Sequence, residues 1–292
     1  MSVGDIAAVV AAVIAIASFV GPVRAYYNRT AGRRFDVYRR FERLGVGAHQ
    51  SFFETVIGEA PAIRRSIIRE LPDYSDLTDD DSEAPLVEHT FTESLWVDPL
   101  FYAQTVADKD GTVLGFSITT RRRRFAPRFA VPRPLPTRSW LLWRLTRGRR
   151  QLPALAQVRL GRTKFSGVVL TDWGLPSVRC LIGARTYSYS EAWYFGNPGH
   201  YSSYVCTASM ASEVGGYPVN MEHIDWPENR DDPDEGFAPT GDDEDPVLAP
   251  WIETVRSSAV VTTWTVIQFP LTPENWPPEN FGPHGDEVRT LP

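Results

Sequence analysis

The beginning of the chain restricts its fold most, because the stretch from Ile6 to Val23 holds 18 residues without a charged side chain. As a helix rising ~1.5 Å per residue it would be about 27 Å long, close to the hydrocarbon thickness of a bilayer. Half of its residues are strongly apolar, and together they would favour insertion by roughly 3–5 kcal/mol. We therefore predict that residues 1–23 form a transmembrane anchor.

Two other interpretations of this stretch stay open. A cleaved signal peptide could end near Ala15-Ile16-Ala17. Signal peptides carry positive charge before their apolar region, however, and here the side-chain charge before it is Asp5. A buried helix of a soluble domain is the second alternative, but an apolar run of this length on every helix face is long for such a helix.

The charge that follows the apolar stretch predicts its orientation, because cytoplasmic flanks of membrane helices are enriched in Arg and Lys. We expect the N-terminus outside and the C-terminal domain in the cytoplasm. Alanines recur at a spacing of four, as in Ala7 and Ala11, which would let two such helices approach closely and form a homo-oligomer. The juxtamembrane basic residues are Arg29, Arg33, Arg34, Arg39, Arg40 and Arg43.

Residues 24–71 are expected to form a juxtamembrane helical stalk. A basic amphipathic helix is predicted over 25–44, a short helix over 49–57, and a third helix over 62–71 after a proline. Residues 72–85 contain six acidic side chains and are expected to form an acidic linker.

From residue 86 the pattern changes to strands. The best hairpin pairs 101–106 with 112–120 across the turn Lys109-Asp110-Gly111. Further strands are expected over 88–97, 156–160, 165–170, 177–182, 186–194, 201–209 and 258–269.

Few segments have a helical period, so parallel strands with helical crossovers are disfavoured. The predicted class is α+β: an N-terminal transmembrane helix and a short helical stalk, then a mainly antiparallel β domain over 86–270, built as a sandwich or partial barrel. Residues 227–250 are expected to form an acidic loop, and 271–292 a Pro-rich tail extended along the surface.

An Arg-rich insertion at 121–150 is the strongest candidate for a binding surface. It contains eleven Arg and no acidic residue, with Trp and Phe between them. This chemistry suits an anionic lipid surface, where aromatic rings insert and guanidinium groups meet phosphates. It also suits a nucleotide or nucleic acid, or pairing with the chain's own acidic segment at 213–253. The candidate residues are Arg121, Arg122, Arg123, Arg124, Arg128, Trp140, Trp143, Arg144, Arg147, Arg149 and Arg150.

Three short sequences point to a resemblance: Leu44-Gly45-Val46-Gly47, then Phe52-Phe53 with Ile57-Gly58, and the turn from Tyr194 to Tyr201 (YFGNPGHY). In these positions the chain resembles an uncharacterised bacterial family of N-terminally membrane-anchored proteins of unknown function. The resemblance implies an architecture and says nothing about catalysis. A bacterial origin also agrees with 28 Arg against two Lys, because Arg codons are GC-rich.

Sequence motifs of catalysis and metal binding are absent. The five His are scattered, and no His-Glu-x-x-His, Cys-x-x-Cys, nucleophile elbow or phosphate-binding Gly-Lys-Ser/Thr loop occurs. A calcium loop starting at Asp231 would place Pro233 at its third ligand position. We therefore expect no metal and no cofactor, and Cys180 and Cys206 as reduced thiols on neighbouring strands rather than as nucleophiles.

The hypothesis that follows is a membrane-anchored cytoplasmic binding or signalling module without catalytic activity, with its basic face toward anionic lipid. The alternative is a nucleotide- or nucleic-acid-responsive membrane effector that oligomerises through its transmembrane helix. An enzyme of unfamiliar type is the third possibility, and a pocket that contains a carboxylate or His with a perturbed pKa would support it.

Overall fold

The computed structural model describes residues 22, 32–58, 60–72, 85–122, 124–132, 154–168, 177–183, 186–195, 202–209, 248–268, 270–273, 275–278, 281–283 and 288. The chain divides into two compact units, residues 1–43 and 44–292. The predicted anchor lies outside the described residues except for Pro22. Among the described residues no helix is both long and apolar enough to cross a membrane.

The first unit contributes helix α2, Arg33–Phe41. Val37 and Phe41 are buried, whereas Phe35 is 56% exposed and its ring meets Tyr38 edge-on. Basic residues occupy the last turn, where they interact favourably with the helix dipole. The prediction of a basic amphipathic helix is confirmed for this described part of 25–44.

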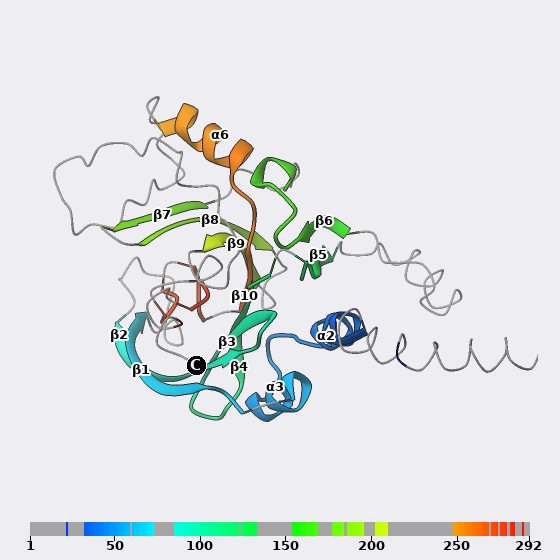
Figure 1. Cartoon of the computed structure of the whole chain (residues 1–292). Coiled ribbons are helices and arrows are strands. Elements are labelled where there is room, and N and C mark those ends of the chain that lie inside the picture. Colours follow the sequence, from blue (N-terminus) through cyan, green and yellow to red (C-terminus); the bar gives the residue numbers. More distant parts are fainter. Residues whose placement is uncertain are drawn as a thin grey trace, which may run out of the picture. The chain divides into compact units, whose positions relative to one another are not determined.

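The second unit is built on one eight-stranded antiparallel sheet (Figure 1). This confirms the predicted mainly antiparallel β domain. In sheet order its strands are β1 (Ile63–Pro72), β2 (Leu86–Val97), β3 (Phe101–Ala107), β4 (Val113–Thr120), β10 (Thr263–Gln268), β9 (Ser202–Ser209), β8 (Thr186–Phe195) and β7 (Ser177–Gly183). The strands β1 to β4 and β7 to β9 form two meanders, and β10 joins them by pairing with β4 and β9.

The remaining elements lie outside this sheet. They are α3 (Gln50–Ile57), the 3-10 helix η2 (Phe165–Gly167), α6 (Leu248–Ser258) and the two-stranded ribbon of β5 (Arg128–Pro132) with β6 (Ala154–Arg159). The predicted helix over 49–57 is confirmed as α3. His49 caps it by accepting a hydrogen bond at Nδ1 from the Ser51 amide, and Phe53 packs on Phe116 of β4 at 5.5 Å between ring centroids.

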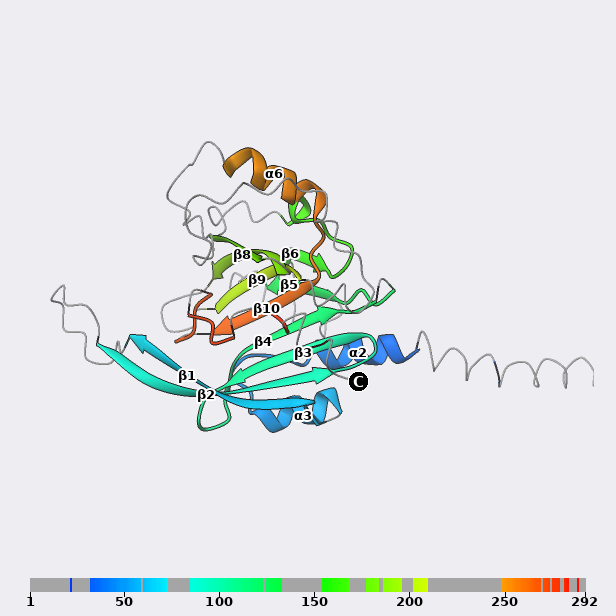
Figure 2. The ribbon, with the colours of Figure 1, turned by 60° about the vertical axis from the view of Figure 1, so that its left-hand side comes forward.

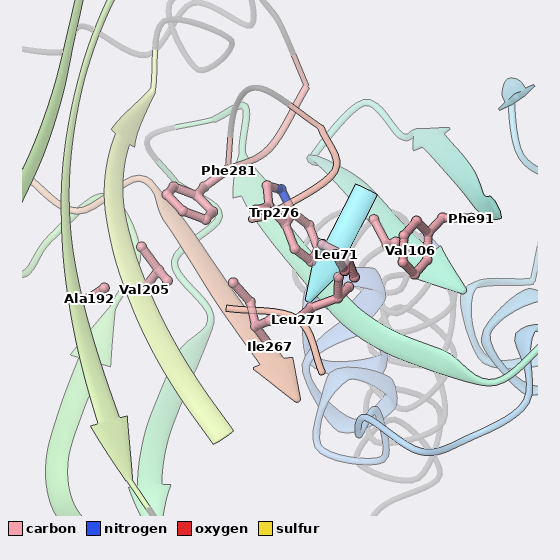
Figure 3. Packing of buried hydrophobic residues seen from close by; sticks show 9 residues of the cluster. All are labelled: Leu71, Phe91, Val106, Ala192, Val205, Ile267, Leu271, Trp276 and Phe281. Atoms are coloured by element: carbon pink, nitrogen blue, oxygen red, sulfur yellow. The ribbon is translucent and has the colours of Figure 1, made fainter. Parts of the chain in front are cut away.

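One face of the sheet is covered by the end of the chain, and we call residues 270–288 the C-terminal strap. Three of its side chains join a buried cluster with residues from strands of both halves of the sheet (Figure 3). Strands that are far apart in the sheet order share this cluster, so the sheet curls around the strap, and we call the face toward it the inner face. The cluster contains Leu71, Phe91, Val106, Ala192, Val205, Ile267, Leu271, Trp276 and Phe281.

One prediction is wrong at the start of the sheet domain. Residues 62–71 were expected to form the third helix of the stalk, but Ile63–Pro72 is strand β1, paired residue by residue with β2 (Figure 2). Ile63, Ile67 and Leu71 recur at a spacing of four, which fits one face of a helix and equally one face of a strand. The adjacent Ile67 and Ile68 are both β-branched, which favours a strand, and pairing with β2 stabilises the extended conformation.

Other differences concern the C-terminal half. The tail after residue 270 was expected on the surface, yet Leu271, Trp276 and Phe281 are buried. Proline is tolerated there because the strap takes no place in the strand ladder. Residues 165–167 form η2 rather than a strand, and the helix α6 was missed. Cys180 and Cys206 lie on β7 and β9 with β8 between them, so their strands are not neighbours.

Candidate functional site

The first two arginines of the Arg-rich insertion are bound to the turn between β2 and β3. The Arg121 guanidinium donates from Nη1 to the backbone oxygen of Asp98 at 2.8 Å. The same group lies 4.5 Å above the ring centroid of Tyr102, a cation–π contact. Arg122, which is exposed, donates from Nε to the backbone oxygen of Pro99 at 3.3 Å. Arg121 is therefore partly a structural residue, whereas Arg122 remains accessible to a ligand.

Aromatic side chains fix the path of the insertion beyond Arg122. Phe125 is buried and stacks on Phe101 at 5.7 Å, and its backbone oxygen accepts a hydrogen bond from Thr120 at 2.7 Å. Phe129 stacks on Trp264 of the central strand β10 at 5.8 Å. The alternation of Arg with Phe thus has a physical basis, because the aromatic rings hold the segment against the sheet while Arg124 and Arg128 are exposed.

The ribbon of β5 and β6 brings the two ends of the insertion together. Their ladder runs from Arg128 paired with Arg159 to Pro132 paired with Ala154. The ladder therefore brings residue 132 and residue 154 next to each other. Of the predicted site residues, Arg123, Trp140, Trp143, Arg144, Arg147, Arg149 and Arg150 lie outside the described residues.

Four of the predicted juxtamembrane residues are on α2 and Arg43 follows it, whereas Arg29 lies outside the described residues. Arg33, Arg39, Arg40 and Arg43 are exposed and Arg34 is half-buried. Phe35 is one helical turn before Arg39, so the two side chains are neighbours on the exposed side. An exposed aromatic ring beside guanidinium groups can bind an interface that is apolar on one side and anionic on the other.

A second cluster, which the sequence did not indicate, lies on the outer face of the sheet beneath α6. Glu191 of β8 is 0% exposed. Its Oε1 accepts a hydrogen bond from the Tyr189 hydroxyl at 2.7 Å and lies 2.9 Å from Nε of Arg256 on α6. Lys164 donates to the backbone oxygen of Ser257 at 2.7 Å, which joins the end of α6 to the start of η2.

Burial changes the proton affinity of this cluster. It raises the pKa of Glu191 to about 7 from 4.5, and the Tyr189 hydrogen bond and the Arg256 charge offset only part of the effect. Burial, and then the charge of Glu191, raises the pKa of the Cys206 thiol. A thiol that holds its proton is a poor nucleophile. Because Glu191 and Cys206 have no exposed surface, the cluster links α6 to the sheet rather than meeting a substrate.

The described part of the chain contains no group of three or more His, Cys, Asp or Glu side chains that could hold a metal ion. No family model, curated protein or solved structure matches the chain. The resemblance to a bacterial family of membrane-anchored proteins therefore stays a prediction, and the function has to be argued from the residues themselves.

Sequence reasoning missed Glu191, Tyr189 and Arg256 because they are distant in the chain and no local motif joins them. One signal was present: Glu191 is an acidic residue inside a strongly aromatic strand, TYSYSEAWYF. A charged residue in such a strand is either at the surface or paired in the interior. The sequence alone could not decide between these two cases. The decision needed the strand register, which sets Glu191 opposite Cys206, and the helix α6, which brings Arg256 to Glu191.

Proposed function

We propose that the chain is a membrane-anchored binding or signalling module without catalytic activity, whose basic residues meet anionic lipid. In this proposal residues 1–23 cross the membrane once, the sheet domain lies in the cytoplasm, and the alanine spacing of the anchor supports a homo-oligomer. The curled sheet with its filled inner face supports the partial barrel over the sandwich as the finer description of the domain.

The exposure of Phe35 on α2 carries the proposal. Helices in soluble proteins usually bury a large aromatic side chain, and α2 does bury Val37 and Phe41. Phe35 remains 56% exposed among the arginines of the same helix. At a membrane surface the ring would enter the interface while the Arg stems extend to the phosphates.

The Arg-rich insertion supplies a second basic surface of the same kind. Its described arginines Arg122, Arg124 and Arg128 are exposed, and their backbone is held by the buried Phe125 and the half-buried Phe129. A rigid base of this kind lowers the entropy that binding would cost. Residues 133–153, which lie between β5 and β6 in the sequence, contain six more Arg and two Trp.

The test is hydrogen–deuterium exchange on the full chain reconstituted into nanodiscs of phosphatidylcholine alone or mixed with phosphatidylglycerol. We expect the amides of 32–43 to exchange more slowly in the anionic discs, and added salt to remove the difference by screening. The triple variant R39Q/R40Q/R43Q should lose this protection.

The matched control is R159Q/R162Q, which removes two exposed arginines next to β6 without touching α2. It should keep the anionic-lipid protection of 32–43. Equal exchange rates of the 32–43 amides in neutral and anionic discs would refute the lipid-binding proposal.

A further inference from the structure

The inner face of the sheet carries a buried polar band where an apolar core would be expected. Its side chains come from β2, β3, β4, β9 and β10 and are all buried. They are Glu93, Gln104, Ser117, Thr119, Thr207, Thr263 and Thr265.

Part of this band is satisfied internally. Gln104 donates to Glu93 at 2.6 Å and accepts from Ser117 at 3.1 Å, and the hydroxyls of Thr119 and Thr263 are 2.8 Å apart. These contacts form a chain of hydrogen bonds across β2, β3 and β4 and a bridge from β4 to β10.

Four polar atoms of the inner face have no hydrogen-bond partner in the described structure: the Tyr102 hydroxyl, Arg121 Nε, Thr207 Oγ1 and Thr265 Oγ1. The residues Tyr102, Thr207 and Thr265 are each at most 2% exposed. Buried polar groups in folded proteins are nearly always hydrogen-bonded, and an unpaired one destabilises the fold. Four such atoms on one face therefore require an explanation.

The strand register places the three hydroxyl groups on one continuous surface, and Arg121 adjoins it through its contact with the Tyr102 ring. Tyr102 is paired with Thr119, Thr119 with Thr263, and Thr263 with Thr207. Thr265 is two residues from Thr263 on β10 and shares its face. From β3 to β9 this surface covers three strand spacings, or about 14 Å, which is the size of a small organic molecule.

The C-terminal strap covers this surface but forms no hydrogen bond with the four unpaired atoms. Gly282 donates its amide to Gln104 at 3.0 Å and comes so close to Thr119 that a Cβ on Gly282 would be 2.6 Å from the hydroxyl. Trp276 covers Gly115 on β4 in the same way. The strap thus excludes water from the band while the four atoms stay unpaired.

We propose that the inner face beneath the C-terminal strap is a binding site for a small phosphate-bearing molecule, which displaces the strap from β4 and β10. All four unpaired groups can donate hydrogen bonds, so they fit a ligand rich in acceptor oxygens. The Arg121 guanidinium supplies positive charge beside Tyr102. The acidic side chain in the band, Glu93, is already paired with Arg65, so its charge is balanced.

The protonation state of Tyr102 agrees with this role. Burial raises the pKa of its hydroxyl, against the opposing charges of Arg121 and Arg122. The phenol therefore keeps its proton at neutral pH and remains a donor to a phosphate oxygen.

The test uses the full chain in phosphatidylcholine nanodiscs, titrated calorimetrically with inorganic phosphate, 5′-AMP and glucose 6-phosphate. Adenosine and glucose serve as controls that lack the phosphate. We expect at least one phosphate-bearing probe to bind and to accelerate hydrogen exchange in residues 270–283, while adenosine and glucose do neither.

The double variant T207V/T265V keeps the side-chain shape and removes two unpaired hydroxyls. It should lower the affinity tenfold or more while the melting temperature without ligand stays equal or rises, since no hydrogen bond is lost. A purely structural role of these hydroxyls would instead lower the melting temperature. T90V, at an exposed position of β2, is the matched control and should leave both values unchanged.

Absence of binding by all three phosphate-bearing probes, or equal affinity in wild type and T207V/T265V, would overturn the proposal. Binding of adenosine or glucose as tightly as their phosphate esters would overturn the assigned ligand chemistry. These outcomes are independent of the lipid-dependent exchange of 32–43, so this site and the membrane surface can fail separately.

Discussion

Trp276 lies directly over Gly115, so that a Cβ placed on Gly115 would come within 2.3 Å of the indole Cζ3. The glycine is in the middle of β4, where a residue without a side chain normally weakens a strand. Here the absent side chain is what allows the C-terminal strap to reach the centre of the sheet.

Replacing Gly115 by alanine should therefore destabilise the fold. The new methyl group would meet Trp276 and, at 3.1 Å, the backbone oxygen of Val266. Overpacking of this kind costs about 1–3 kcal/mol in the free energy of unfolding. The measurement is urea denaturation of the full chain. Gly45→Ala is the control, since nothing lies within 4 Å of a Cβ at Gly45, and its midpoint should not move.

Trp276→Ala should destabilise the fold by about 3–5 kcal/mol, because it removes a large buried side chain and leaves a cavity. In this background the additional change Gly115→Ala should cost much less than it does alone, because the methyl group then occupies vacated space. A double-mutant cycle by urea denaturation measures the coupling. Strictly additive effects would mean that the two residues are not in contact.

The stability of the protein should fall as pH rises through the titration range of Glu191. Its pKa is about 7 in the folded chain against an ordinary value of 4.5, so between these values the folded state holds a proton that the unfolded state has released. The contribution is complete below the unfolded pKa and is lost above the folded one, a change of roughly 3 kcal/mol.

Glu191→Gln should remove most of this pH dependence and make the protein more stable than wild type at about pH 8, where the wild-type carboxylate is charged and buried. Denaturation midpoints of wild type and Glu191→Gln between about pH 5 and pH 8 test this prediction. Glu253→Gln removes an exposed carboxylate that also faces Arg256 and whose charge adds a minor part to the raised pKa of Glu191, so it should reduce the slope only slightly. A wild-type slope in the Glu191 variant would contradict the assignment.

Cys206 should resist thiol reagents as long as the chain is folded. It is 0% exposed, and burial raises the pKa of its thiol. In a Cys180→Ser background at neutral pH, maleimide should add no mass to the native protein and one label after unfolding in urea. Thr90→Cys, at an exposed position, is the positive control. Rapid native labelling of Cys206 would show that α6 does not close this side of the sheet.

Local patterns in the sequence predicted the elements whose signals are local. Alternation and the Lys109-Asp110-Gly111 turn predicted the β3–β4 hairpin, in which Gly111 has a φ of 80°. The spacing that sets Phe52, Phe53 and Ile57 on one side predicted α3. These features are decided within a few residues, so no knowledge of the rest of the fold was needed.

The wrong predictions depend on contacts with distant residues. Residues 62–71 satisfy both a helical and an extended pattern, and only pairing with β2 selects the strand. The Pro-rich composition of the strap predicted a surface tail, whereas the spaces over Gly115 and Thr119 decide where Trp276 and Gly282 go. The polar inner band could not be predicted, since each Thr alone is ordinary in a strand and only the register places them together.

The position of β10 has a consequence for synthesis. Among the described strands this one comes last in the sequence, yet it lies in the middle of the sheet and joins the β1–β4 meander to the β7–β9 meander. While the ribosome is still translating the region before residue 263, each meander has an open edge that is destined for β10. The two halves can become one cooperative domain only after residues 263–268 have emerged, so the nascent chain must remain protected from aggregation until then.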